Sequence, residues 1–294
     1  MNWLSVQRKL APYLFVSPFF LGLLVFWAYP ALYGLYLSFF RQTGLGQGTF
    51  VGLENYVKLF SDERFLRSLL NTTYYAAGSV FFIVPLALFV AIILQARFVR
   101  FKHLFRLAFF LPLITSSVVV AIMFVLIFEQ RHGLLNTVLA TLGLPAVPWL
   151  LDPALGVPTL ILLGAWKWTG VNAVYFLVGL QNIPSDITEA AAIDGANRWQ
   201  VFRHVVFPLL RPITLFVVVT AIFGSYKLFG EPYVLQGGGG GPSDSMLTMT
   251  IYLYLTGFRF LNIGYAAAIG YAMMIIMMVL SLLQLRLFGA FKED

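Results

Sequence analysis

The side chains best placed to contact a polar ligand lie inside an apolar segment. Residues 158–181, PTLILLGAWKWTGVNAVYFLVGLQ, carry a lysine, an asparagine and a tyrosine among aliphatic residues. One face of a helix over this segment would carry Gly164, Trp168, Asn172, Tyr175 and Gly179. A buried amide and a phenol beside small residues are typical of a bundle interior or a cavity. The candidates for a solute path are therefore Lys167, Trp168, Asn172, Tyr175 and, in a later segment, Tyr226. The aromatic rings could stack on a sugar ring or only pack, and Trp166 has the same two interpretations.

Lys167 is a charged residue at membrane depth. It lies nine residues after Pro158, or about 14 Å at the rise of a helix. An isolated charge there costs about 2.5–3.5 kcal/mol, so we expect it to be paired or hydrated. Two partners remain open: a hydroxyl or phosphate of a ligand, or an acid or carbonyl of another subunit. Lys227, nearer an interface, is expected to pair with Glu231 four residues later on the same helix.

A second polar stretch, EAAAIDGANRWQVFRHVVFPLLRP (189–212), lies between two apolar segments. With Asp186 as N-cap, Glu189 has the capping-box spacing, which predicts a short helix over 187–193. Gly195 then ends that helix, since glycine adopts the left-handed conformation without strain. Asn197 and Gln200 predict a second capped helix. The stretch is therefore expected to form a helical hairpin.

The hairpin has two interpretations. Glu189 could only cap, Gly195 could only turn, and Trp199 and Phe202 could only pack against neighbouring segments. Alternatively, the small side chains Ala190–Ala192 leave room for another protein to approach closely, which favours a docking surface.

No catalytic constellation is visible in the sequence. The chain has no cysteine, which excludes disulfides and thiolate metal sites. Glycine is never followed by lysine, so the G-x-x-x-x-G-K-[ST] phosphate loop is absent. His103, His132 and His204 lack the spacing of metal ligands. We expect no metal site, no cofactor and no enzymatic activity in this chain.

The elements that position these residues are membrane spans. The chain is 60% hydrophobic and 11% charged, with a mean hydropathy of +0.86, which is too apolar for a soluble domain. About 20 apolar residues cross a bilayer, and six segments qualify: about 12–38, 70–95, 104–128, 158–181, 210–231 and 264–288. The first lacks a small-x-small cleavage site, so we interpret it as a span and not a signal peptide. The predicted fold is an all-α polytopic membrane protein of six transmembrane helices, with residues 1–294 as a single domain.

Basic residues predict the orientation. Alternate loops collect eleven Lys and Arg on one side and six on the other, and the richer side is expected to be cytoplasmic. Both termini and the hairpin would then be cytoplasmic. The basic cluster RFVRFKHLFR (97–106) is expected to contact lipid headgroups and not nucleic acid.

Three loops lie on the opposite side. Residues 48–73 indicate an amphipathic segment, and residues 133–153 indicate a short helix followed by a proline-containing turn. QGGGGGPSDS (236–245) is expected to be a flexible tip, because consecutive glycines lose the most entropy on ordering. That tip is either a plain linker or a finger that reaches a partner.

The hairpin resembles the EAA loop of the membrane subunits of ATP-binding-cassette importers. That pattern is Glu-Ala-Ala, two residues, Asp-Gly-Ala, five residues, Phe, two residues, Ile, one residue, Leu-Pro, three residues, Pro. In register are Glu189, Ala190, Ala191, Asp194, Gly195, Ala196, Phe202, Pro208 and Pro212. Val205 and Phe207 depart conservatively from Ile and Leu. GLENY (52–56), GLLNTVLATLGL with WLLDP, GLQNIPSDITEAAAIDGA, and GGGGGP followed by GYAAAIGYAMM are similar to the first permease subunit of the maltose and glycerol-3-phosphate kind.

The resemblance implies a type I importer transmembrane domain, with 185–212 as the loop that couples it to a cytoplasmic ATPase. Glu189 would face basic residues of the ATPase, and Gly195 would set the angle between the two helices. Implied partners are a second permease in a heterodimer, an ATPase dimer that binds ATP and Mg²⁺, an extracytoplasmic solute-binding protein and membrane lipid. The implied cargo is a sugar or oligosaccharide, and the implied location is the inner membrane of a prokaryote.

Three alternatives remain. The cargo could be glycerol-3-phosphate or its diesters, which a cation at Lys167 would favour. A secondary transporter without an ATPase would show paired broken helices and intramembrane carboxylates in an internal repeat, whereas Glu129 and Glu231 are expected at span ends. A membrane scaffold without transport is disfavoured by the polar face of 158–181.

Overall fold

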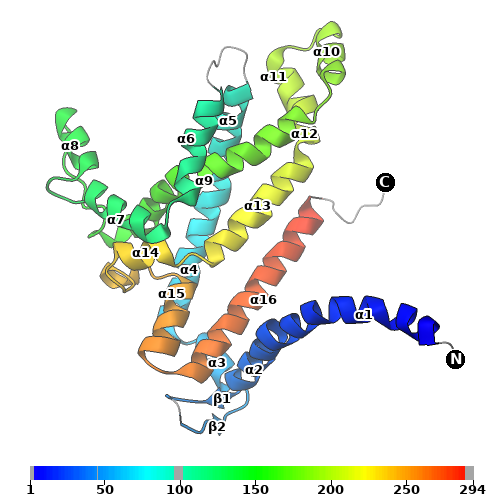
Figure 1. Cartoon of the computed structure of the whole chain (residues 1–294). Coiled ribbons are helices and arrows are strands. Elements are labelled where there is room, and N and C mark those ends of the chain that lie inside the picture. The colour runs from blue at the N-terminus through cyan, green and yellow to red at the C-terminus, as the bar shows by residue number, and fades with distance from the viewer. Residues whose placement is uncertain (1–2, 45, 96–101, 289–294) are drawn as a thin grey trace. The chain divides into compact units, whose positions relative to one another are not determined.

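The structure is a computed structural model that describes residues 3–44, 46–95 and 102–288, and their side chains except those of 3–10, 102, 103 and 106. The described chain is mostly helical (Figure 1). It divides into two compact units, Met1–Ser61 with Leu253–Ala272 and Asp62–Tyr252 with Met273–Asp294. Several residues used for the orientation or the histidine argument lie outside the described residues or side chains: Arg8, Lys9, Arg97, Arg100, Lys102, His103, Arg106 and Lys292.

The first unit contains one long apolar helical segment and a small sheet. Its elements are α1 (Trp3–Leu23), a π-helical turn (Leu24–Ala28), α2 (Tyr29–Ser38), β1 (Phe40–Arg41), β2 (Thr49–Phe50), α3 (Glu54–Leu59), a second π-helical turn (Leu255–Arg259) and the first part of α16 (Ile263–Leu287). The antiparallel strands pair Phe40 with Phe50. Asn55 of the GLENY motif is buried, and its Nδ2 donates to the carbonyls of Ser38 (2.8 Å) and Phe40 (3.0 Å). This amide therefore satisfies backbone acceptors where α2 ends.

The second unit holds the other elements and both predicted functional regions. They are α4 (Glu63–Gly78), a π-helical turn (Ser79–Ile83), α5 (Val84–Gln95), α6 (Lys102–Ile114), α7 (Ser117–Ile127), α8 (Leu134–Thr141), a 3₁₀ turn (Pro153–Leu155), α9 (Gly156–Gln181), α10 (Ser185–Ile193), α11 (Arg198–Val201), a π-helical turn (Phe202–Val206), α12 (Phe207–Leu209), α13 (Arg211–Tyr226), α14 (Gly230–Leu235), a 3₁₀ turn (Pro242–Asp244), the start of α15 (Met249–Tyr254) and the second part of α16. The predicted helix in 133–153 is confirmed by α8.

Five helical segments among the described residues are long and apolar enough to cross a membrane. They are Ala11–Ser38, Glu63–Gln95, Pro153–Gln181, Arg211–Leu235 and Ile263–Leu287. These overlap five of the six predicted spans.

The third predicted span, 104–128, is not one continuous helix, although its two halves together are apolar enough for a broken span or a re-entrant loop. Leu107–Ile114 and Ser117–Ile127 meet at an angle of 105°. Ser116 has an extended backbone conformation (φ −55°, ψ 135°), and Pro112 lies in the last turn of α6. Hydropathy alone does not reveal this change of direction, because both halves are apolar.

Helix α9 lies at the centre of the second unit and packs closely on its neighbours. Ala173, Phe176 and Leu177 form a core with Ala87 and Ala91 of α5. A Cβ at Gly170 would lie 1.8 Å from the carbonyl oxygen of Phe109 on α6. Small residues on both sides let these backbones approach, as is common between membrane helices. The packing of α5 and α6 against α9 therefore determines the position of α9 and of its polar face.

Candidate solute cavity and coupling segment

A cavity of about 160 Å³ lies beside the polar face of α9. It is lined by Tyr75, Ser79, Leu113, Trp168, Val171, Asn172, Tyr175, Thr220, Ala221, Gly224 and Ser225. The wall thus comes from α4, the π turn after it, α6, α9 and α13. Three of the sequence-predicted solute-path residues, Trp168, Asn172 and Tyr175, are brought together here.

The cavity presents one amide among aromatic and hydroxyl groups. Asn172 as a whole residue is 7% exposed, and its side chain makes no hydrogen bond with the described residues. Ser225 Oγ is already bonded to the Ala221 carbonyl at 2.7 Å. The ring of Tyr175 meets that of Phe216 edge-on, with centroids 5.2 Å apart. An amide with free donors and acceptors beside flat rings can bind a hydroxylated solute.

Lys167 lies outside this cavity wall and is paired within the chain. Its Nζ donates to Ser117 Oγ at 2.8 Å and forms an ion pair with Glu231 Oε1. The Lys167 and Glu231 side chains are only 5% and 6% exposed. Nζ also lies 5.3 Å from the Trp168 ring centroid. The expected requirement for a partner is met by an acid of the same chain.

The predicted pair of Lys227 with Glu231 is wrong. Helix α13 ends at Tyr226, and α14 begins at Gly230. The two residues are therefore not on one continuous helix, which the four-residue spacing requires. Glu231, which we expected at a span end, is buried.

Tyr226 is buried and is not among the residues that line the cavity. Its hydroxyl shares a hydrogen bond of 3.0 Å with Thr73 Oγ1, and its carbonyl accepts one of 2.9 Å from Thr250 Oγ1. Trp166 packs against Phe124, with ring centroids 5.4 Å apart. These contacts join helices.

The predicted coupling segment, residues 185–212, forms a helical hairpin at one end of the second unit (Figure 1). Helix α10 ends in a left-handed turn at Gly195, with φ +85°. The Gly195 amide donates to the Ala192 carbonyl at 3.1 Å, and the Ala196 amide donates to the Ala191 carbonyl at 3.0 Å. These two bonds make a Schellman motif, which confirms the predicted glycine stop.

Only one of the two predicted capping boxes forms. The Gln200 amide donates to Asn197 Oδ1 at 2.9 Å, and the Asn197 amide donates to Gln200 Oε1 at 2.8 Å. The box of Asp186 with Glu189 is wrong, because α10 begins at Ser185 after an extended Pro184 and has no side-chain cap. Asp186 is therefore inside the first turn.

The predicted coupling residues lie on the hairpin, and most of them are accessible to solvent. Glu189, Ala190, Asp194 and Gly195 are exposed, and Ala191, Ala196 and Phe202 are half-buried. Ile193 is 86% exposed and Trp199 is 64% exposed. Trp199 therefore does not bury itself on neighbouring described segments, although its ring stacks on Phe202 at 5.8 Å. Sequence reasoning missed Ile193, whose signal is an aliphatic residue next to the Asp-Gly turn.

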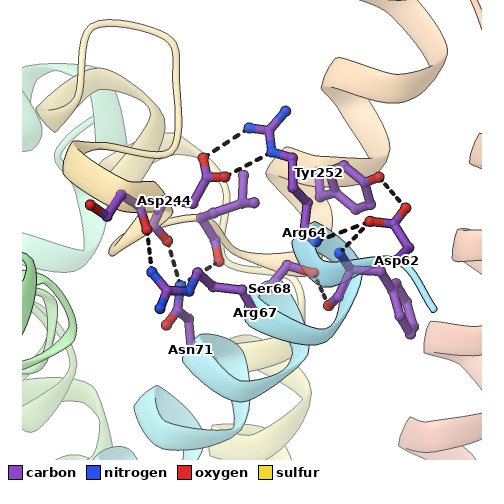
Figure 2. Close-up of polar contacts among 10 residues, drawn as sticks. Asp62, Arg64, Arg67, Ser68, Asn71, Asp244 and Tyr252 are labelled. Carbon is purple, nitrogen blue, oxygen red and sulfur yellow. Dashed lines mark hydrogen bonds and ion pairs between the residues drawn. The ribbon is translucent and has the colours of Figure 1, made fainter. Parts of the chain in front are cut away.

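A polar cluster, which we call the α4 cluster, fixes the segment that follows the glycine run (Figure 2). Arg64 binds both carboxylate oxygens of Asp244, at 2.7 and 2.8 Å. Arg67 donates to the Ser243 carbonyl at 2.5 Å, and Asn71 donates to the carbonyls of Asp244 (2.8 Å) and Leu247 (3.1 Å).

The predicted flexible tip over 236–245 is therefore anchored to α4 at its C-terminal end. The Met246 amide also donates to the Gly240 carbonyl at 2.8 Å, which closes the glycine-rich loop. The helical spacing of Arg64, Arg67 and Asn71 was the sequence signal that could have predicted the α4 cluster.

The remaining titratable loop residues form no metal site within the described part of the chain. Glu129 accepts a hydrogen bond of 2.9 Å from the Arg131 amide and another from the His132 amide. These two donors hold the pKa of the Glu129 carboxyl below its usual value. His204 Nδ1 lies 3.1 Å from the Gln200 carbonyl on its own helix.

Solved structures with the same fold are bacterial importers. A bacterial ABC transporter involved in the import of the acidic polysaccharide alginate matches with a TM-score of 0.85 at 23% identity, covering 99% of both chains. The alginate transporter in complex with its alginate pentasaccharide-bound periplasmic protein matches with a TM-score of 0.82 at 24% identity, covering 96% of this chain and 95% of that one.

Sequence relatives give the family. The arabinooligosaccharides transport system permease protein AraP of Bacillus subtilis is 39% identical over 99% of this chain and 92% of the relative. The lactose transport system permease protein LacF of Rhizobium radiobacter is 37% identical over 92% of both chains. The sn-glycerol-3-phosphate transport system permease protein UgpA of Agrobacterium fabrum is 34% identical over 97% of both. Residues 83–292 match the family described as the inner membrane component of binding-protein-dependent transport systems, and the chain belongs to that family.

Proposed function

We propose that this chain is the permease subunit of an ATP-driven importer for a sugar or oligosaccharide that an extracytoplasmic solute-binding protein delivers. It is a permease and not an enzyme, so ATP and Mg²⁺ bind to a separate ATPase. The single observation that carries the proposal is the cavity beside α9, with Trp168, Asn172 and Tyr175 in its wall, in a chain of the binding-protein-dependent family.

The cavity wall favours a neutral solute. None of its lining residues is charged, and the nearby ammonium of Lys167 is already neutralised by Glu231. A phosphate bound beside the cavity would need a cation or several donors to replace its hydration. Glycerol-3-phosphate, which the name of the relative UgpA gives, and its diesters are therefore the second candidate.

The hairpin supplies a route for energy from the ATPase. Exposed apolar side chains at Ile193 and Trp199 flank the EAA residues, and buried aromatic and aliphatic anchors contribute much of the affinity of protein interfaces. In the proposed complex Glu189 faces basic residues of the ATPase, and Gly195 keeps the two short helices at a fixed angle. Closure of the ATPase dimer then moves the hairpin and switches the accessible side of the cavity.

The rest of the assembly follows from the same mechanism. Six spans enclose little space by themselves, so a second permease in a heterodimer completes the pathway. The hairpin and both termini are cytoplasmic, and the opposite side receives the binding protein. The complex is then a multi-pass assembly of a prokaryotic inner membrane.

Uptake into proteoliposomes tests the proposal. The chain is reconstituted with its partner permease, ATPase and binding protein, with ATP enclosed on the ATPase side. We expect radiolabelled sugar or oligosaccharide to accumulate only when ATP and the loaded binding protein are both present. Accumulation without ATP would support a secondary transporter and contradict the proposal. Preferential uptake of glycerol-3-phosphate by the same complex would contradict the neutral cargo.

A further inference from the structure

One ammonium group connects three helices at two helix breaks. Lys167 is on α9, and its two partners are Ser117, the first residue of α7, and Glu231, the second residue of α14. Helix α7 follows the bend of 105°, and α14 follows the end of α13 at Tyr226. We call these three residues the Lys167 tether. It ties both interrupted helices to the continuous helix α9.

The tether is enclosed by a tightly packed core. Val120 of α7, Leu163 of α9 and Leu235 of α14 belong to one buried apolar cluster. A Cβ at Gly230 would lie 3.0 Å from Ser117 Cβ, so α7 and α14 touch where they begin. Separating α14 from α9 would leave an ammonium and a carboxylate without partners in an apolar site, which is strongly unfavourable. Separating α7 would remove the hydrogen bond that Ser117 Oγ accepts from Lys167 and would break the packing of the apolar cluster.

The tether also lies directly beside the cavity. Trp168, the residue after Lys167, lines the cavity, and so do Gly224 and Ser225 shortly before the break that leads to α14. The other α9 residues of the wall all follow Lys167 in the chain. The tether therefore borders the end of the cavity nearer Gly156.

We propose that Lys167 is a positioning residue: with Ser117 and Glu231 it holds α7, α9 and α14 together as one rigid body throughout the transport cycle. This inference rests on the proposed function. It requires the cavity to open and close at the edges of this body, against the second permease, and not by separation of α7 from α14.

A reversible cross-link tests the rigid body directly. The chain has no cysteine, so Ser117→Cys/Gly230→Cys introduces its only two thiols. Their Cβ atoms would be 3.0 Å apart, and a shift of about half an ångström reaches disulfide geometry. The assay is ATP-driven uptake into proteoliposomes with cysteine-free partners, before and after oxidation, with bond formation measured by mass spectrometry. Each single-cysteine variant is the control for oxidation.

We expect the oxidised and reduced forms of the double variant to transport at rates within about twofold of each other, because a bond inside a rigid body restricts no necessary motion. Loss of uptake on oxidation that a reductant restores would overturn the proposal. Failure of the bond to form in the folded complex would overturn it too, because the two helices would not stay in contact.

Charge variants test the role of Lys167 itself. Lys167→Met and Glu231→Gln each leave one buried charge unpaired, and we expect solute transported per ATP hydrolysed to fall by about tenfold or more. The exchanged pair, Lys167→Glu/Glu231→Lys, should recover a large part of that coupling ratio. Measuring the ratio on equal amounts of assembled complex separates positioning from loss of folding.

The outcomes distinguish the two proposals. If the unmodified complex shows no ATP-dependent uptake, the proposed function fails. If it transports normally and both single variants keep the full coupling ratio, or the exchanged pair recovers nothing, the tether alone is refuted.

Discussion

Substitutions of Gly195 should reduce the coupling of ATP hydrolysis to transport. The size of the loss should depend only on how well each new residue adopts the left-handed backbone conformation. Its φ is +85°, and apart from its two chain neighbours no described residue has an atom within 4 Å of the position that a Cβ would take. A side chain would therefore clash with nothing in the described chain, and the cost comes from the left-handed conformation. That cost is about 1–2 kcal/mol for alanine and less for asparagine. Alanine should then lower the population of the native hairpin about 5- to 30-fold relative to a bent alternative.

Proline at position 195 should have the largest effect of the substitutions. Its ring fixes φ near −65°, far from the native value, and it lacks the amide that Gly195 donates to the Ala192 carbonyl. We expect coupling to decrease from glycine through asparagine and alanine to proline, which should abolish it. The assay is ATP-driven uptake, together with stimulation of the ATPase by loaded binding protein, in complexes of matched abundance. Unaltered uptake in Gly195→Pro, or an asparagine variant no better than proline, would refute the reasoning.

Three other predictions concern the cavity and the loops. Asn172→Leu removes the free amide at nearly constant volume, and half-maximal uptake should need about two- to tenfold more solute; an unchanged concentration dependence would remove Asn172 from the solute path. Arg64→Ala should lower the stability of the purified complex by on the order of 1 kcal/mol or less, since the Arg64–Asp244 pair is partly exposed. The same substitution should make the glycine-rich loop more sensitive to proteases. A loop that stays equally resistant would argue against the α4 cluster as its anchor. The lowered pKa of Glu129 stabilises the fold above the ordinary pKa of 4.5, and that contribution is lost as the pH falls through the lower folded-state pKa. The melting temperature should therefore decline more steeply over this pH range for the unmodified protein than for Glu129→Gln. Identical dependence of the melting temperature on pH in the two proteins would contradict this prediction.

The sequence predicts most of what local chemistry determines. The Gly195 stop and the Asn197 capping box depend on residues a few positions apart, and both form as predicted. The polar face of α9 follows from helical spacing, and three of its residues line one cavity. The structure confirms these predictions because residues close together in the sequence determine them.

The errors arise where distant segments decide the outcome. Glu231 has Lys227 four residues before it, but its partner is Lys167, because the helix breaks between 226 and 230. The glycine run favours disorder by composition, yet side chains of α4 fix the segment after it. The bend near Ser116 has no hydropathy signal. In each case a tertiary contact or a helix break overrides a pattern that a single segment suggests.

The most direct test of the central claim is contact between the hairpin and an ATPase. Ile193 is 86% exposed, so Ile193→Cys places a unique, reachable thiol beside Gly195. A thiol-specific photoreactive cross-linker at this site, in the assembled complex in membranes, should attach the chain to the ATPase subunit, with a yield that changes when ATP is added. Cross-links only to lipid or to this chain, in a complex that still carries out ATP-driven uptake, would contradict the account.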